Sequence, residues 1–134
     1  LNVWLYSNGW LLFVTDSTDL DGINSPVFVT NLKGRQVPYT SQVFEPIVLC
    51  WFKANKDMFD GHMMVPLFTT ATQEDGKETY RATPEFDSRG AWYDWAMINF
   101  VTEEGGGNNV VPGKLLRFFR ISDGQEMASA HCCG

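Results

Sequence analysis

Aromatic side chains crowd around one carboxylate in the stretch RGAWYDWAMINF, residues 89 to 100. The four residues with chemical potential are Trp92, Tyr93, Asp94 and Trp95. Aromatic ring faces attract cations, and a neighbouring carboxylate strengthens the attraction for an ammonium or guanidinium group. These four residues are our candidate ligand-binding site, and the ligand that they would suit is a basic or methylated peptide.

The same stretch also has a purely structural interpretation. As a strand it would alternate between two faces, with Tyr93, Trp95, Met97 and Val101 on one and Trp92, Asp94, Ala96, Ile98 and Phe100 on the other. Both faces are mostly apolar. Such a strand is expected to lie between two layers of core, because aromatic residues at strand spacing are more often core than site.

Asp94 allows further roles. Paired with Glu85 or Asp87 it could supply the two carboxyl groups that glycoside hydrolysis requires, about 5 to 10 Å apart. The sequence does not fix that distance. A salt bridge to Arg81 or Arg89, or a hydrogen bond to the backbone, is the alternative that we favour.

Two other groups of residues resemble metal sites. The segment DSTDLDG, residues 16 to 22, offers the oxygen ligands that calcium prefers, but the bidentate glutamate of an EF-hand loop is replaced by Phe28. The residues that could be assembled into a zinc site are Cys50, His62, His131, Cys132 and Cys133. Adjacent ligands on a strand point to opposite faces, which disfavours zinc. We therefore predict no metal site, no cofactor and no catalytic residue, and we favour a binding domain over an enzyme.

The charge of the chain disfavours nucleic acid. The formal net charge is −6 and the pI is about 4.7, whereas polyanions are attracted by clustered basic residues. The densest basic group is Lys114, Arg117 and Arg120, so any nucleic-acid contact would be local. No stretch approaches the roughly 20 apolar residues that cross a bilayer. We expect a protein or a basic peptide as the partner, and no membrane.

Turn signals recur along all 134 residues. The Asn-Gly and Asp-Gly pairs that tight hairpins favour lie at 8–9, 21–22, 60–61, 75–76 and 123–124. The segments between them are rich in β-branched and aromatic residues, as strands are. The predicted fold class is all-β: a small barrel or sandwich of about nine short, mainly antiparallel strands. Residues 1 to 134 are expected to form a single β-rich domain and to be a fragment of a longer protein.

Three further segments have the composition of strands. Residues 63–70 (MMVPLFTT) and 91–101 (AWYDWAMINFV) each predict one continuous strand. Residues 47–53 (IVLCWFK) are apolar on both faces and predict a central strand with Cys50 buried. No helix is expected anywhere in the chain.

Three segments of the C-terminal half follow one another in a recognisable order: YRATPEF, GAWYDWAMINF and VPGKLLRFF. They cover about residues 80 to 121. This order resembles an uncharacterised β-rich domain in the open reading frames of Plavaka-like DNA transposons. The resemblance implies an accessory domain of a mobile-element or viral protein. The strand order is also similar to small chromatin-reading barrels of the BAH or Tudor type, which is an analogy of fold alone.

These features predict a non-catalytic interaction domain that uses residues 92 to 95. Two alternatives stay open: a capsid-like assembly module in which the aromatic rings are core, and a carbohydrate-binding module or glycoside hydrolase. The three cysteines lack the spacing of a disulfide framework, which indicates a reducing, intracellular compartment. A chromatin reader would work in the nucleus. The sequence leaves the ligand, the oligomeric state and the parent protein open.

Overall fold

The computed structural model describes residues 3–7, 9–14, 19–20, 28–29, 35–59, 64–73, 78–87, 90–101, 108–122 and 125–132. In chain order the elements are β1 (Val3–Ser7), β2 (Trp10–Val14), β3 (Asp19–Leu20), β4 (Phe28–Val29), β5 (Arg35–Pro38), α1 (Pro46–Ala54), the short 3-10 helix η2 (Lys56–Phe59), β6 (Met64–Phe68), β7 (Thr70–Gln73), β8 (Thr79–Asp87), β9 (Gly90–Tyr93), β10 (Trp95–Val101), β11 (Asn108–Ser122) and β12 (Gln125–Cys132).

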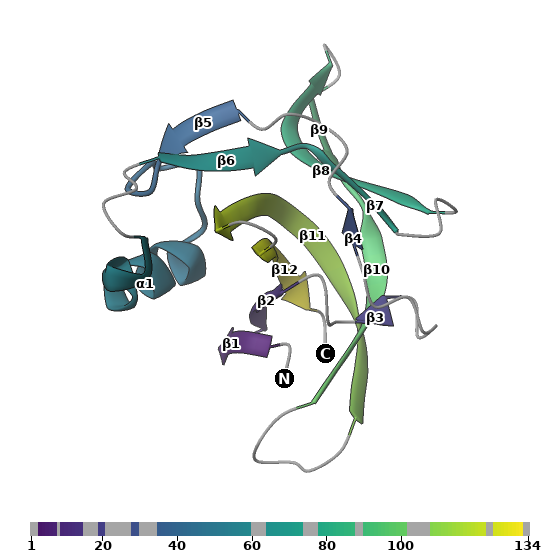
Figure 1. The fold of residues 1–134 in the computed structure, drawn as a ribbon. Helices are drawn as coiled ribbons and strands as arrows, with labels where there is room; N and C mark the ends of the chain where they lie inside the picture. Colours follow the sequence, from purple (N-terminus) through teal and green to yellow (C-terminus); the bar gives the residue numbers. More distant parts are fainter. Residues whose placement is uncertain are drawn as a thin grey trace.

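The strands form two sheets, and every recorded pairing is antiparallel. The larger sheet has the order β1-β2-β12-β11-β10-β3, with β6 on β11 and β5 on β6, and the smaller has the order β4-β7-β8-β9. The long curved β11 organises the larger sheet (Figure 1), because β12 follows one of its edges while β10 and β6 share the other. The predicted fold class, all-β and mainly antiparallel, is confirmed.

Two strands pass from one sheet into the other at a single residue. Thr69 separates β6 from β7, and Asp94 separates β9 from β10. At the first crossing the Ala82 amide donates to the Thr69 carbonyl oxygen at 2.9 Å. The continuous strands expected at 63–70 and 91–101 are therefore each divided, with one part in each sheet.

Each face of the larger sheet packs, over part of its area, against a hydrophobic core. The first core contains Leu11, Phe68, Ala71, Tyr80, Ala82, Ala96, Ile98, Leu115, Phe118, Ala128, Ala130 and Cys132. The second contains Leu12, Val37, Phe44, Ile47, Val48, Trp51, Phe52, Val65, Phe119, Ile121 and Met127. Neighbours along one strand, such as Phe118 and Phe119, face opposite cores. The central strand with core on both faces is thus β11.

The segment expected to be that central strand is instead the helix α1. Its buried side chains recur at helical spacing on one face: Ile47, Val48, Trp51 and Phe52. Pro46 occupies the first turn, where its missing N–H costs nothing. Both the strand expected at 47–53 and the expectation of no helix are wrong, because a helix that buries one face against a sheet overrides the β propensity of its residues. Cys50 is exposed on the other face of α1, contrary to the prediction.

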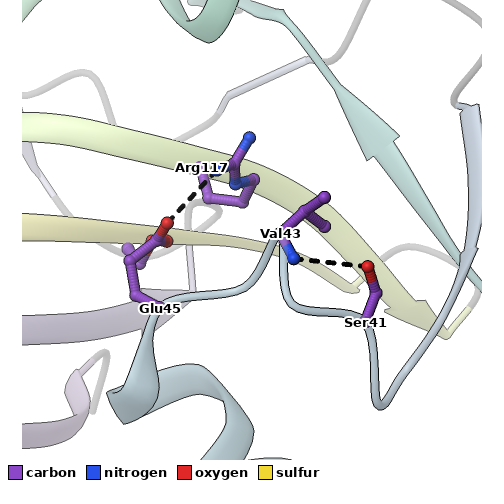
Figure 2. Close-up of polar contacts among 5 residues, drawn as sticks. Ser41, Val43, Glu45 and Arg117 are labelled. Atoms are coloured by element: carbon purple, nitrogen blue, oxygen red, sulfur yellow. Dashed lines mark hydrogen bonds and ion pairs between the residues drawn. The ribbon is translucent and has the colours of Figure 1, made fainter.

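Glu45, at the N-terminus of α1, ties the helix to the larger sheet. Its side chain does not cap the helix; instead one carboxylate oxygen lies 3.2 Å from Nη2 of Arg117 in β11. The other accepts a 2.7 Å hydrogen bond from the Ser129 hydroxyl in β12. Figure 2 shows the carboxylate reaching from the helix to Arg117, beside the turn in which the Val43 amide donates to the Ser41 hydroxyl at 3.3 Å. One carboxylate thus contacts two buried polar side chains of the sheet.

We predict that Glu45→Ala lowers the free energy of unfolding by about 3 kcal/mol, because it leaves the Arg117 guanidinium buried without its counter-charge. Ser129→Ala removes one hydrogen bond and should cost only about 1 kcal/mol. Urea unfolding followed by circular dichroism measures both. Equal costs for the two variants would show that the ion pair does not hold α1 to the sheet.

Candidate functional site

The run from β9 to β10 carries all four candidate residues, and none of them is buried. Trp95 is 51% exposed and Trp92 is 39% exposed, while Tyr93 and Asp94 are half-buried. The interpretation of this run as a strand between two layers of core is therefore wrong.

Asp94 is a structural residue of the sheet crossing. The register of β8 and β9, in which Ala82 faces Tyr93, places Arg81 opposite Asp94. The Asp94 amide donates to the Arg81 carbonyl oxygen at 2.8 Å, but the Asp94 carbonyl oxygen is taken by the Leu115 amide of β11, also at 2.8 Å. The Arg81 amide instead donates to Oδ2 of the Asp94 side chain at 2.7 Å. The carboxylate thus stands in for a carbonyl that has turned to the other sheet. The hydrogen bond to backbone that we favoured for Asp94 is confirmed.

The second carboxylate oxygen of Asp94 holds a tryptophan. Trp92 Nε1 donates to Oδ1 at 2.7 Å, and the guanidinium carbon of Arg81 lies 5.1 Å from the centre of the Trp92 ring. Such a cation over a ring contributes about 0.5 to 1 kcal/mol at exposed positions. Trp92 is therefore oriented by two groups of the protein itself.

Tyr93 and Lys114 form a similar pair. Nζ of Lys114 lies 5.1 Å from the centre of the Tyr93 ring, and Tyr93 also packs against the first core. The Trp92 and Tyr93 rings, which we expected to bind a cation of the ligand, thus each lie against a cation of the protein itself.

Trp95 belongs to a different environment, the outer face of β10 and β11. In the register of these strands Trp95 faces Lys114 and Met97 faces Pro112, and facing residues of an antiparallel pair share one side of the sheet. Trp95, Met97 and Pro112 are exposed and Lys114 is half-buried. We call these four residues the outer patch. The alternating residues on the inner side, including Ala96 and Ile98, are buried.

The outer patch is apolar where a solvated sheet face is normally polar. Large hydrophobic side chains are exposed at four described positions, and two of them, Trp95 at 51% and Met97 at 40%, lie on this face. Exposed apolar groups that gather in this way mark surfaces that bind another molecule. Strand alternation from Trp95 identifies Met97 from sequence, whereas Pro112 and Lys114 required the register of β10 on β11.

The remaining catalytic and metal-binding candidates gain no support. The side chains of Glu85, Asp87 and Arg89 lie outside the described residues, as do His62 and Cys133 and most of residues 16–22. Among the described side chains no group of three or more His, Cys, Asp or Glu could hold a metal ion. His131 packs edge-on against Trp10, with ring centres 4.6 Å apart, and Cys132 is buried in the first core.

The three basic residues of β11 do not form a common surface. Arg117 is buried and paired with Glu45. The guanidinium carbon of Arg120 lies 4.9 Å from the centre of the Phe68 ring, and Lys114 lies over Tyr93. Each cation is thus engaged with a different part of the protein.

Comparisons with known proteins give no family. A scan against protein-family models finds no match, and searches of curated proteins and of solved structures find none either. The resemblance to transposon open reading frames stays a prediction. In the part of the chain that the structure describes, no helix is long and apolar enough to cross a membrane.

We predict that Asp94→Ala lowers the free energy of unfolding by about 2 kcal/mol, since it removes an ionised acceptor from two hydrogen bonds. Asp94→Asn keeps one acceptor oxygen and should cost about half as much. Guanidinium unfolding followed by tryptophan fluorescence measures both values. If the alanine variant is as stable as the wild type, the carboxylate does not hold the crossing together.

Proposed function

We propose that this domain is a non-catalytic interaction module that binds a segment of a partner protein on the outer patch. The observation that carries the proposal is the pairing of exposed Trp95 and Met97 with Pro112 and Lys114 on one side of the β10–β11 pair. Aromatic residues and methionine are enriched in protein interfaces. A tryptophan is also among the residues that most often dominate binding energy.

The charges around the patch favour an acidic partner segment. Lys114 is the charged member of the patch, whereas both carboxylate oxygens of Asp94 already accept hydrogen bonds from the protein. A basic or methylated peptide, the ligand expected from the sequence, would meet Lys114 and the Arg81 guanidinium over Trp92. We therefore infer a segment with apolar side chains for Trp95 and Met97 and a carboxylate for Lys114.

The biological setting rests on the sequence resemblance. A mobile-element or viral protein would use such a module as an accessory domain that binds a partner. A capsid-like role, with a second copy of this chain on the patch, is the competing function.

We predict that Trp95→Ala and Met97→Ala each weaken binding of acidic peptides by at least about tenfold, because interface tryptophans commonly contribute more than 1 kcal/mol. Peptides would be selected on wild-type protein from a random display library, and their affinities measured by fluorescence anisotropy. The selected sequences should be enriched in Asp, Glu and apolar residues. The melting temperature should be unchanged, since a surface substitution alters stability little.

Met64→Ala is the matched control, because Met64 is 44% exposed but lies on β6. It should bind as the wild type does. Selection of basic or methyl-lysine peptides whose binding depends on Trp92 and not on Met97 would contradict the proposal. It would favour the cation-binding site expected from the sequence at residues 92 to 95. Sedimentation would favour the assembly function if the wild type formed concentration-dependent dimers and the Trp95→Ala variant stayed monomeric.

A further inference from the structure

A second site of different chemistry lies beside α1. A cavity of about 390 Å³ opens between the helix and the turn that follows β5. It is lined by Tyr39, Thr40, Leu49, Phe52, Lys53 and Lys56. Its volume falls within the roughly 300 to 1,000 Å³ that is usual for small-molecule sites.

The floor of this cavity is apolar and well supported. Phe52 is only 1% exposed, and its ring meets the Phe44 and Phe119 rings edge-on, with centres 5.0 and 5.5 Å away. Tyr39 packs on it from the side, at 6.4 Å and nearly perpendicular. Leu49 also packs against the second core. A ligand in the cavity would therefore meet rings and a leucine whose positions are fixed by the core behind them.

The rim of the cavity is cationic. Lys53, in the last turn of α1, and Lys56, at the start of η2, are both exposed and both line the opening. The cavity lining thus combines an apolar floor with two exposed ammonium groups. Its third exposed lining residue, Thr40, adds a hydroxyl that can donate a hydrogen bond.

We propose that this cavity binds a small anionic amphiphile, whose hydrocarbon or aromatic body lies against Phe52, Leu49 and Tyr39 and whose carboxylate or phosphate faces Lys53 and Lys56. Such a ligand complements both features of the cavity: its apolar body matches the apolar interior, and its negative charge matches the cationic rim. The site is independent of the outer patch, since it is built from α1, η2 and the turn after β5.

Two-dimensional ¹H–¹⁵N NMR titration of the wild-type chain tests the proposal. The probes are 2-naphthoate and octanoate. Neutral 2-naphthamide is the control for the charged group, and inorganic phosphate is the control for the apolar part of the ligand. At least one carboxylate should cause saturable shifts in the amides of the lining residues. It should bind about fivefold to tenfold tighter than the amide, and its affinity should fall as salt is raised.

The double variant Lys53→Gln/Lys56→Gln should remove this preference and leave binding of the neutral amide unchanged. Lys114→Gln removes one positive charge on the outer patch and should bind the probes as the wild type does. The positive charge of Lys53 also stabilises the C-terminal end of α1. The melting temperature of the double variant is therefore compared with that of the wild type. If the double variant unfolds, the proposal is still tested by the preference of the wild-type protein for 2-naphthoate over 2-naphthamide.

Three outcomes overturn the proposal. They are no saturable shifts at the cavity with either carboxylate, equal affinity for 2-naphthoate and 2-naphthamide in wild-type protein, and an unchanged preference for the acid in a folded double variant. None of these results affects the outer patch, whose test uses peptides and Trp95.

Discussion

At Asp94 one residue has to satisfy two sheets at once, and the positions of the aromatic side chains depend on how it does so. Its carbonyl oxygen is used by Leu115 in the larger sheet, so its carboxylate becomes the acceptor for Arg81 in the smaller one. A short acidic side chain can reach back in this way without leaving the strand. With the crossing fixed, Trp92 is held against the carboxylate, while Trp95 begins a new strand whose outer side faces solvent.

The two-sided core around β11 explains why Arg117 of that strand is not available at the surface. Arg117 lies where β11 has core on both faces, and Glu45 brings a carboxylate to it from the helix. Burying a charge without such a partner would cost several kcal/mol. The same carboxylate holds α1 against the second core, and α1 in turn supplies the wall of the cavity.

Turn residues and strand composition predicted much of the fold, whereas features that depend on contacts between distant segments were missed. The first hairpin forms as expected: Ser7 of β1 pairs with Trp10 of β2, and Gly9 lies between them at φ +85°. The composition of residues 47 to 53 is typical of a strand, whereas the spacing of their apolar side chains also fits a helix. The helix forms because one of its faces packs against the sheet. The exposure of Trp95 was equally hidden, because the sequence shows that its neighbours alternate but not which side meets the core. Lys114 joined the candidate site only through the register of β10 on β11.

The overall charge and the local charge of this protein favour partners of opposite charge, and the proposed acidic partner follows from the local charge. The chain carries a net charge of −6, but charges farther apart than about 8 Å are largely screened at physiological ionic strength. A carboxylate placed on the outer patch is within that distance of Lys114, while Asp94 is already occupied by two hydrogen-bond donors. An acidic segment would therefore be repelled weakly at long range and attracted on contact. The proposed binding would therefore depend on the fit of apolar side chains to Trp95 and Met97 more than on electrostatic steering.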